Sequence, residues 1–210
     1  LQRIRLMDKK IIFLDLDGTL TNDEKKITPK TKEALMDIQK RGHIVALASG
    51  RPTPGMGFIA KELELEKYGG YVMSFNGGKI IDWKTKETVF ENTLDRKYLP
   101  DLIRYARQNN LGLITYDNKQ GLVATRVDPY VMLETVKINR IPAFLTDVVK
   151  YVDYNPNKCL YTVDPEISEY HEKRLAEKFG DVLSVYRSTD YFIEIVPKGI
   201  DKAASIKVLI

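Results

Sequence analysis

The sequence predicts an α/β protein in which an open parallel sheet, built through right-handed crossovers, is interrupted by an inserted α+β module. Three short apolar runs, at residues 10–16, 44–48 and 71–75, alternate with helical segments. Each run has the length of a strand and is apolar on both faces, which is typical of a parallel sheet that helices cover. After Gly77-Gly78 apolar and polar residues alternate, which favours antiparallel strands.

The first crossover helix is expected to begin at Thr28-Pro29 and to end at Gly42. Threonine is a good N-cap, proline fits the first helical position, and glycine commonly follows a helix. A second helix is expected at about 56–66, between the second and third apolar runs. Strand, helix, strand, helix and strand in this order, with short connections, predict neighbouring parallel strands.

The chain divides into a core and an insertion. Residues 1–79 and 197–210 are assigned to the parallel-sheet core, and residues 80–196 to the inserted α+β domain. From residue 79 onward, alternating segments are expected at 79–83 and 122–126, and helices at 95–109 and 165–179. After Pro197 a final helical stretch, at 201–210, is expected to return to the core.

Composition excludes several classes of protein. The chain has 210 residues, of which 43% are hydrophobic and 30% charged, and no apolar run approaches the roughly 20 residues of a membrane span. The first ten residues lack a hydrophobic signal region, so a cytoplasmic location is expected. The net charge is only +4, with basic and acidic residues interspersed, which does not indicate a nucleic-acid surface. The single Cys159 fits a reducing compartment and a buried thiol.

The strongest motif is Asp15-Leu16-Asp17-Gly18-Thr19, at the carboxyl end of the first predicted strand. Ligands bind at this end of the strands in open α/β sheets. Carboxylates can hold a hard cation or attack phosphorus directly, and the backbone amides beyond the glycine can meet an anion. A plain polar turn would explain Asp17-Gly18 but not Asp15, because a carboxylate in a buried apolar run is costly unless it is compensated.

Two further polar tips follow the second and third strands. In Ser49-Gly50-Arg51 a hydroxyl, a glycine amide and a guanidinium can form a phosphate cradle. Taken alone, this segment is also an ordinary turn. Asn76, at the end of the third strand, can contact a substrate, while Asn76-Gly77 can equally be a hinge turn; both interpretations stay open.

A late lysine is also a candidate phosphate contact. Lys198 and Lys202 lie near the start of the last helical stretch, where an ammonium group can hold phosphate oxygens and offset the clustered carboxylates. An arbitrary lysine is usually a solvated surface residue. The sequence pattern alone does not decide whether Lys198 or Lys202 contacts the phosphate.

These segments together resemble the haloacid dehalogenase superfamily. Asp-Leu-Asp-Gly-Thr, Ala-Ser-Gly-Arg, Phe-Asn-Gly-Gly and Lys-Gly-Ile-Asp-Lys occur in the family's order, from about residue 8 to the last residue. Within the superfamily the chain resembles the Cof-like phosphatases, which carry a large α/β cap after the third core strand. The resemblance implies a Rossmann-like parallel-sheet core, with a cap at about 80–196 that closes over the substrate and selects it.

The resemblance also implies roles for individual residues. Asp15 would be the nucleophile, and Asp17 the general acid and then the base for the hydrolytic water. The Asp15 carboxylate and the Asp17 carbonyl would bind Mg²⁺. Lys202 is the better match to the family's catalytic lysine, with Lys198 on the rim. Phosphate and substrate contacts would come from Gly18, Thr19, Ser49, Gly50, Arg51, Asn76 and Lys198.

The expected reaction is Mg²⁺-dependent hydrolysis of small phosphate monoesters, sugar phosphates foremost, through an aspartyl-phosphate. The expected partner is a small phosphorylated metabolite, and the protein is expected to be a monomer or a weak homo-oligomer. Two alternatives stay open: a phosphosugar mutase or phosphotransferase, and a non-catalytic phosphate-binding protein. No local pattern in 80–196 identifies the substrate.

One family feature is missing. Members continue past the lysine helix into a strand that ends in a Gly-Asp…Asn-Asp motif, which supplies another metal-binding carboxylate. Only eight residues follow Lys202. We expect the natural protein to continue, because the sheet edge would otherwise be exposed. With two protein ligands alone, Mg²⁺ is expected to bind weakly unless phosphate helps.

Overall fold

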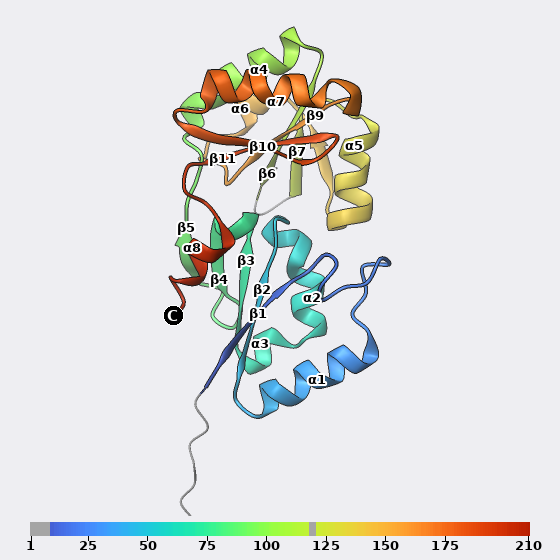
Figure 1. Ribbon diagram of the computed structural model, residues 1–210, viewed down its shortest axis with the longest axis vertical. Helices are drawn as coiled ribbons and strands as arrows, with labels where there is room; N and C mark the ends of the chain where they lie inside the picture. The colour runs from blue at the N-terminus through green and yellow to red at the C-terminus, as the bar shows by residue number, and fades with distance from the viewer. Residues whose placement is uncertain (1–8, 118–120) are drawn as a thin grey trace, which may run out of the picture.

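The computed structural model describes residues 9–117 and 121–210. In that part of the chain two sheets lie one above the other, each with its own helices (Figure 1). The lower unit, the core, is built from residues 9–92 and from the chain after residue 197. The upper unit, residues 94–197, is the cap. No helix of the described residues is long and apolar enough to cross a membrane.

The core sheet has five strands in the order β1-β2-β3-β4-β5. The strands are β1 (Ile11–Asp15), β2 (Ile44–Ala48), β3 (Gly70–Ser74), β4 (Lys79–Asp82) and β5 (Thr88–Glu91). The first three are parallel, and the last two join them antiparallel. The helical segments are α1 (Pro29–Lys40), η1 (Thr53–Met56), α2 (Gly57–Glu62), α3 (Leu65–Tyr68), η2 (Phe75–Gly77) and α8 (Lys202–Ile206).

The three parallel strands and the first helix form where the sequence predicts them. Thr28 caps α1 by accepting a hydrogen bond from the Thr31 amide at 3.3 Å, and Pro29 occupies the first turn. The predicted second helix is instead split into short pieces, since Glu64 adopts a left-handed backbone between α2 and α3. Side chains of α1, α2 and α3 bury one face of the sheet, among them Leu35, Ile59 and Leu65.

Strands β4 and β5 correct the boundary predicted at residue 80. They extend the core sheet through hydrogen bonds to β3, so the core continues to Glu91 rather than ending at residue 79. Alternating apolar and polar residues identify an antiparallel strand but not the sheet that it joins. The chain leaves the core only after Asn92, where Leu94 enters the apolar interior of the cap.

The cap sheet has six strands in the order β10-β11-β9-β6-β7-β8, all antiparallel except the pair β7-β8. The strands are β6 (Gly112–Asp117), β7 (Gly121–Ala124), β8 (Ala143–Leu145), β9 (Cys159–Thr162), β10 (Leu183–Thr189) and β11 (Phe192–Pro197). The helices are η3 (Arg96–Tyr98), α4 (Leu99–Gln108), α5 (Pro129–Met132), the π-helix η4 (Leu133–Asn139), α6 (Val148–Tyr151) and α7 (Pro165–Phe179).

The two faces of the cap sheet have different neighbours. Helices α4, α6 and α7 pack on the outer face, around Leu102, Val148 and Leu175. The inner face packs against α5 and against Phe75 of the core, whose ring meets Tyr116 edge-on at a centroid distance of 5.6 Å. The inner face of the cap therefore lies over the end of the core sheet where β1, β2 and β3 finish.

The last helix returns to this end of the core. Asp201 caps α8 by accepting a hydrogen bond from the Ala204 amide at 2.7 Å, and Ser205 donates to the Gly77 carbonyl at 3.0 Å. Ile206 and Leu209 then pack on the second face of the core sheet. The helix ends at Ile206 and is thus shorter than the predicted stretch 201–210.

Candidate active site

Asp15 is the last residue of β1, and the chain turns sharply after it. Leu20 donates its amide to the Asp15 carbonyl at 3.1 Å, and Gly18 takes a left-handed backbone with φ +77°. Leu16 is buried inside the core, so Asp15 and Asp17 on either side of it point the opposite way. Their side chains are 40% and 39% exposed, which leaves both carboxylates accessible to a ligand.

Lys202 contacts Asp15 directly. Its ammonium group forms an ion pair with Asp15 Oδ1, although the two residues are 187 positions apart in the chain. The N-cap at Asp201 and the Ser205–Gly77 bond fix α8, so the lysine at its first position reaches the end of β1. Lys198, by contrast, is exposed, and within the described residues it forms no hydrogen bond or ion pair with Asp15 or Asp17.

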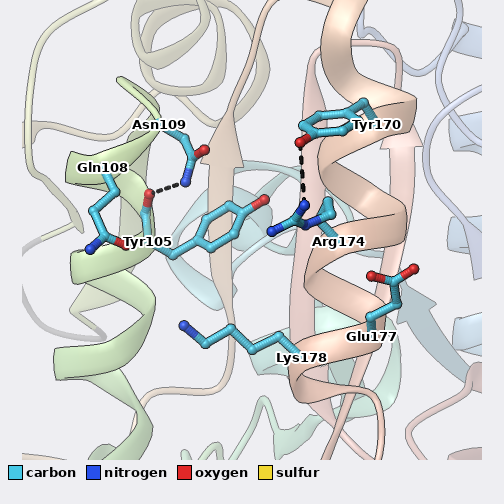
Figure 2. A pocket seen from close by; sticks show the side chains of 7 residues that line it. All are labelled: Tyr105, Gln108, Asn109, Tyr170, Arg174, Glu177 and Lys178. Atoms are coloured by element: carbon cyan, nitrogen blue, oxygen red, sulfur yellow. Dashed lines mark hydrogen bonds between the residues drawn. The ribbon is translucent and has the colours of Figure 1, made fainter.

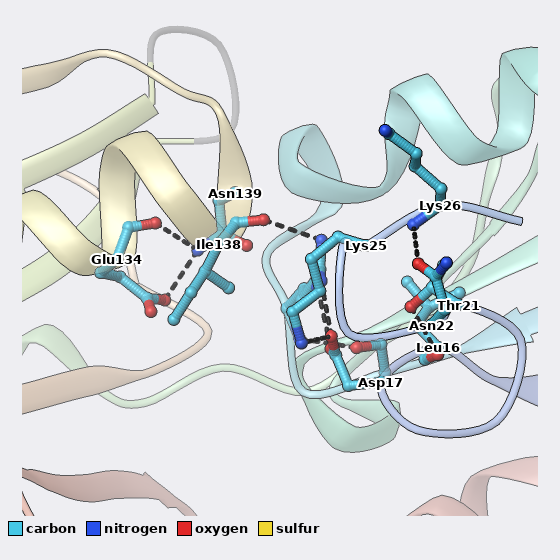
Figure 3. A network of polar contacts seen from close by, with 11 residues as sticks. Leu16, Asp17, Thr21, Asn22, Lys25, Lys26, Glu134, Ile138 and Asn139 are labelled. Atoms are coloured by element: carbon cyan, nitrogen blue, oxygen red, sulfur yellow. Dashed lines mark hydrogen bonds and ion pairs between the residues drawn. The ribbon is translucent and has the colours of Figure 1, made fainter.

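Asp17 is held by two cations. Arg51 donates Nε to Oδ2 at 3.0 Å and Nη2 to Oδ1 at 2.7 Å, and Lys25 donates to Oδ1 at 2.7 Å (Figure 3). Burial by itself raises the pKa of Asp17, but the hydrogen bonds and charges of Arg51 and Lys25 outweigh it and hold that pKa below its ordinary value. Asp17 is therefore ionised in this arrangement.

No motif in the sequence marks Lys25, which lies in a charged segment typical of a solvated turn. The turn is tightly built: Lys25 donates its amide to the Asn22 carbonyl at 2.8 Å, and Asn22 Oδ1 accepts from the Lys26 amide at 3.0 Å. Lys25 adopts φ +60°, a left-handed conformation that non-glycine residues take at a cost. This turn directs its side chain toward Asp17 (Figure 3).

The tips of β2 and β3 lock together beside the carboxylates. The Ser49 carbonyl accepts from the Asn76 amide at 2.9 Å, and the Arg51 carbonyl accepts from the Phe75 amide at 3.0 Å. A Cβ on Gly50 would lie 3.1 Å from Asn76 Oδ1, so a larger residue there would require the Asn76 side chain to shift. Ser49 Oγ accepts from the Arg51 amide at 3.2 Å, and Ser49 is only 3% exposed.

The structure thus brings most of the predicted residues to one place. Asp15, Asp17, Gly18 and Thr19 follow β1, Ser49, Gly50 and Arg51 follow β2, Asn76 follows β3, and Lys202 joins them from α8. Gly18 and Thr19 are exposed in the turn, where the Thr19 amide donates to the Leu16 carbonyl at 3.5 Å. Ser49 and Arg51 are the exceptions in accessibility, at 3% and 4% exposed.

The cap touches the same core residues. Arg51 donates Nη1 to the Ile138 carbonyl of η4 at 2.8 Å, and Lys158 of the cap donates to the Gly50 carbonyl at 3.1 Å. Asn76 Nδ2 donates to the Tyr186 hydroxyl at 3.3 Å. All three core partners belong to the predicted phosphate-binding set.

Lys158, Tyr186 and Glu194 form a polar cluster on the inner face of the cap that sequence reasoning missed. Glu194 accepts from Lys158 at 3.3 Å and from the Tyr186 hydroxyl at 3.0 Å. Lys158 and Glu194 are 3% and 5% exposed. Lys158 directly precedes β9 and Glu194 lies within β11, so the pairing of these two strands brings the two side chains together.

Two oxygen ligands for a hard cation are open after β1. Lys202 occupies only Oδ1 of Asp15, and no donor in the described part of the chain reaches the Asp17 backbone carbonyl. Carboxylate and carbonyl oxygens are ligands that Mg²⁺ prefers. Within residues 9–117 and 121–210 no group of three or more His, Cys, Asp or Glu side chains gathers. The pair fits Mg²⁺ as part of a ligand set that water and a phosphate would complete.

A separate hollow of about 390 Å³ lies between α4 and α7 on the outer face of the cap (Figure 2). Tyr105, Tyr170 and Arg174 line it, and Arg174 donates to the Tyr170 hydroxyl at 3.5 Å. No residue that the sequence singled out for chemistry lies there. The candidate site is therefore the junction of core and cap, not this outer hollow.

Comparison with known proteins gives a family match over nearly the whole chain. The family profile described as haloacid dehalogenase-like hydrolase matches residues 12–210. A Streptococcus pyogenes protein named "Putative phosphatase" is 27% identical over 205 residues, covering 96% of this chain and 75% of its own length. A Bacillus subtilis protein of the same name is 29% identical over 213 residues, covering 95% and 74%.

Solved structures agree with this match. A haloacid dehalogenase-like hydrolase from Bacteroides thetaiotaomicron is 41% identical, with a TM-score of 0.91 over 96% of this chain and 75% of that one. A Thermotoga maritima protein at 23% identity shares the fold, with a TM-score of 0.84 over 96% and 73% of the two chains. The chain thus spans about three quarters of the length of these relatives.

Proposed function

We propose, on the premise that this chain belongs to the haloacid dehalogenase-like hydrolases, that it hydrolyses small phosphate monoesters through an aspartyl-phosphate on Asp15. The family match confirms the resemblance predicted from the sequence, and two relatives carry a phosphatase name. Sugar phosphates are the substrates proposed first, as the resemblance to the Cof-like phosphatases implies.

One observation supports the proposal most: the end of β1 presents two carboxylates with different partners. Asp15 meets the single ammonium of Lys202 and keeps its second oxygen open, as a nucleophile requires. Asp17 lies beside it, next to Arg51 and Lys25. A nucleophile and a proton-transfer group placed together at the end of a buried strand suit phosphoryl transfer, which depends mainly on positioning and charge neutralisation.

The proposed reaction has two steps. An Asp15 carboxylate oxygen attacks phosphorus, the bond from phosphorus to the leaving oxygen breaks, and that oxygen takes a proton from Asp17. Asp17 then removes a proton from water, whose oxygen attacks the phosphorus of the aspartyl-phosphate. Inorganic phosphate leaves and the Asp15 carboxylate is restored.

Other residues hold the transferring group. Lys202 neutralises the oxygens beside Asp15, and Gly18 and Thr19 of the exposed turn, together with Ser49, bind the phosphoryl group. Mg²⁺, held by the Asp15 carboxylate and the Asp17 carbonyl, would neutralise further charge on the phosphoryl oxygens. Because Ser49 is covered in the closed arrangement, its contact requires the β2 tip or the cap to shift when phosphate enters.

A phosphate-release assay with Asp15→Asn tests the proposal. The amide keeps the shape of the side chain but cannot form the acyl phosphate, so we expect turnover to fall at least 10³-fold, on the order of the loss of a catalytic nucleophile. Circular dichroism should show an unchanged fold. Release that persists at a tenth of the original rate would exclude Asp15 as the nucleophile.

The same assay separates the other readings. Omission of Mg²⁺, with a chelator present, should abolish release. A phosphosugar mutase would return an isomeric sugar phosphate instead of free phosphate, so product identification distinguishes it. A protein that binds phosphate esters but releases nothing, with or without Mg²⁺, would be a binding protein rather than a hydrolase.

A further inference from the structure

A cleft of about 420 Å³ opens at the junction of core and cap, beside Lys25, which pairs with Asp17. Its core wall is the turn at Asp23, Glu24 and Lys25, and its cap wall is η4 with the residues that follow it. This volume lies within the range of small-ligand sites, about 300–1,000 Å³. The cleft was not foreseen from the sequence, because it depends on how η4 lies across from the turn.

Two lining residues connect the cleft to the proposed proton donor. Lys25 lines it and donates to Asp17 at 2.7 Å (Figure 3). Ile138 lines the opposite side, and its carbonyl accepts from Arg51, which also holds Asp17. Asp17 itself does not line the cleft, but Lys25 both lines it and contacts Asp17, so a leaving group that Asp17 protonates can extend past Lys25 into the cleft.

The cap wall carries two cations without a carboxylate partner among the described residues. Lys137 and Arg140 both line the cleft, and neither forms an ion pair within the described part of the chain. The Arg140 guanidinium lies over the Phe58 ring, 4.6 Å from its centroid, and its backbone is fixed at φ +55° after η4. Stacking of this kind orients the guanidinium before a ligand arrives.

The remaining charges do not cancel these cations. Lys25 is paired with Asp17, and Glu24 accepts from Lys26 at 2.8 Å, which leaves Asp23 as the acid on the core wall. Among the described residues, two unpaired cations on one wall against one acid on the other make the cap side of the cleft attractive to an anion. Tyr191 completes that side and stacks on Tyr130 with a centroid distance of 5.0 Å and an interplanar angle of 6°.

We propose that this cleft receives the leaving group and that Lys137 and Arg140 select substrates whose leaving group carries its own oxyanion. The oxyanion is a carboxylate or a second phosphate, and the carbon skeleton lies against Tyr191. This inference rests on the proposed function, because only hydrolysis makes this part of the ligand a leaving group. The binding preference itself can be measured without turnover. Bidentate contact from Arg140 favours such groups over a hydroxyl.

The test compares ligands that share the phosphate and the six-carbon chain. Isothermal calorimetry on the Asp15→Asn protein, which does not consume them, measures glucose 6-phosphate, 6-phosphogluconate and glucose 1,6-bisphosphate. A charge-assisted hydrogen bond is worth about tenfold in affinity, so at least one doubly anionic ligand should bind about tenfold more tightly than glucose 6-phosphate. The two arms distinguish a carboxylate from a phosphate as the preferred group.

Substitutions then locate the preference. Lys137→Met, at an exposed position, should reduce the affinity ratio several-fold, and Lys137→Met with Arg140→Gln should bring it close to one. Lys150→Met is the matched control: it removes an 85% exposed lysine of the cap that lies outside the cleft, and it should leave the ratio unchanged.

Equal affinity for all three ligands would overturn the inference, as would a preference that survives the double substitution. Phosphate release from the unaltered protein is measured separately with the same three compounds. Binding preference without release from any of them would contradict the proposed hydrolysis and leave the selection by Lys137 and Arg140 standing. Phosphate release without a binding preference would support the proposed hydrolysis and contradict the selection by Lys137 and Arg140.

Discussion

Asp17 illustrates how the surroundings of one side chain bear on its proposed chemistry. Arg51 and Lys25 keep its carboxyl ionised, whereas a proton donor must carry a proton when the leaving oxygen departs. A phosphate dianion is a strong competitor for a guanidinium. We therefore expect substrate phosphate to draw Arg51 away from Asp17, which raises the pKa of Asp17 at the stage where the proton is needed.

Removing the second cation tests this relation. Lys25→Met eliminates a hydrogen bond and a positive charge that lower the pKa of Asp17, so that pKa should rise. The acid form of Asp17 then persists to higher pH, and the alkaline limb of the kcat–pH profile should move upward by about one pH unit or less, as for a partly exposed pair.

Lys26→Met is the control for Lys25→Met, because the Lys26 ammonium pairs with Glu24 and not with Asp17. It should leave the alkaline limb in place. The kcat values are best measured with an alkyl phosphate, whose departure needs protonation, and with an aryl phosphate, whose departure needs little. A Lys25→Met profile that coincides with that of Lys26→Met would show that Lys25 does not act on Asp17.

At the scale of elements, patterns local in sequence were enough for the three parallel strands and for α1. Buried runs and the Thr28-Pro29 cap carry their own signals. Strands β4 and β5 were assigned to the wrong unit because alternation does not say which sheet a strand joins. The interruption at Glu64 and the π-helix η4 also escaped prediction, since no local pattern in the sequence marks either of them.

The residues of the candidate site also divide into those that local sequence patterns predicted and those that they did not. Asp15, Asp17 and Arg51 stand at strand ends, where topology alone predicts a ligand site. The residues alone left Lys198 and Lys202 as equal candidates, and only the family resemblance favoured Lys202. Lys25 could not be found, because its role arises from a left-handed turn that no local pattern in the sequence marks.

The docking of α8 on η2 can be tested at Gly77. This residue adopts φ +97°, and a Cβ on it would lie 2.3 Å from Ser205 Oγ, so Gly77→Ala combines backbone strain with a clash. Gly42→Ala is the matched control, since Gly42 has φ +89° but open space around its Cβ position. Both should lose about 1 kcal/mol in urea unfolding through strain, and Gly77→Ala should lose more.

Activity adds a second measurement to this pair. Gly77→Ala should also lower phosphate release, because displacement of Ser205 moves α8 and with it Lys202, whereas Gly42→Ala lies away from the carboxylates and should not. Equal stability losses and equal activities in the two variants would mean that the close contact of α8 with Gly77 does not position Lys202.

At the scale of the whole molecule, the cap rests on the parts of the core that are proposed to hold phosphate (Figure 1). Arg51, Gly50 and Asn76 each bond to the cap, and Phe75 inserts into the apolar inner face of the cap sheet. Entry of a phosphate at these residues must therefore disturb the contacts that hold the cap in place. Substrate binding and the position of the cap are coupled through the same few atoms.

The buried pair of Lys158 and Glu194 allows this coupling to be separated from stability. Lys158→Met leaves the Glu194 carboxylate buried with Tyr186 as its remaining partner and should lower the free energy of unfolding by about 3–5 kcal/mol. Lys158→Met with Glu194→Leu replaces the pair by apolar side chains of similar size, and urea unfolding should show that most of the loss is recovered.

Both variants lack the hydrogen bond from Lys158 to the Gly50 carbonyl. If that bond seats the cap, phosphate release should therefore fall in the double variant despite its restored stability. Full activity in a stable double variant would show that the cap closes without it.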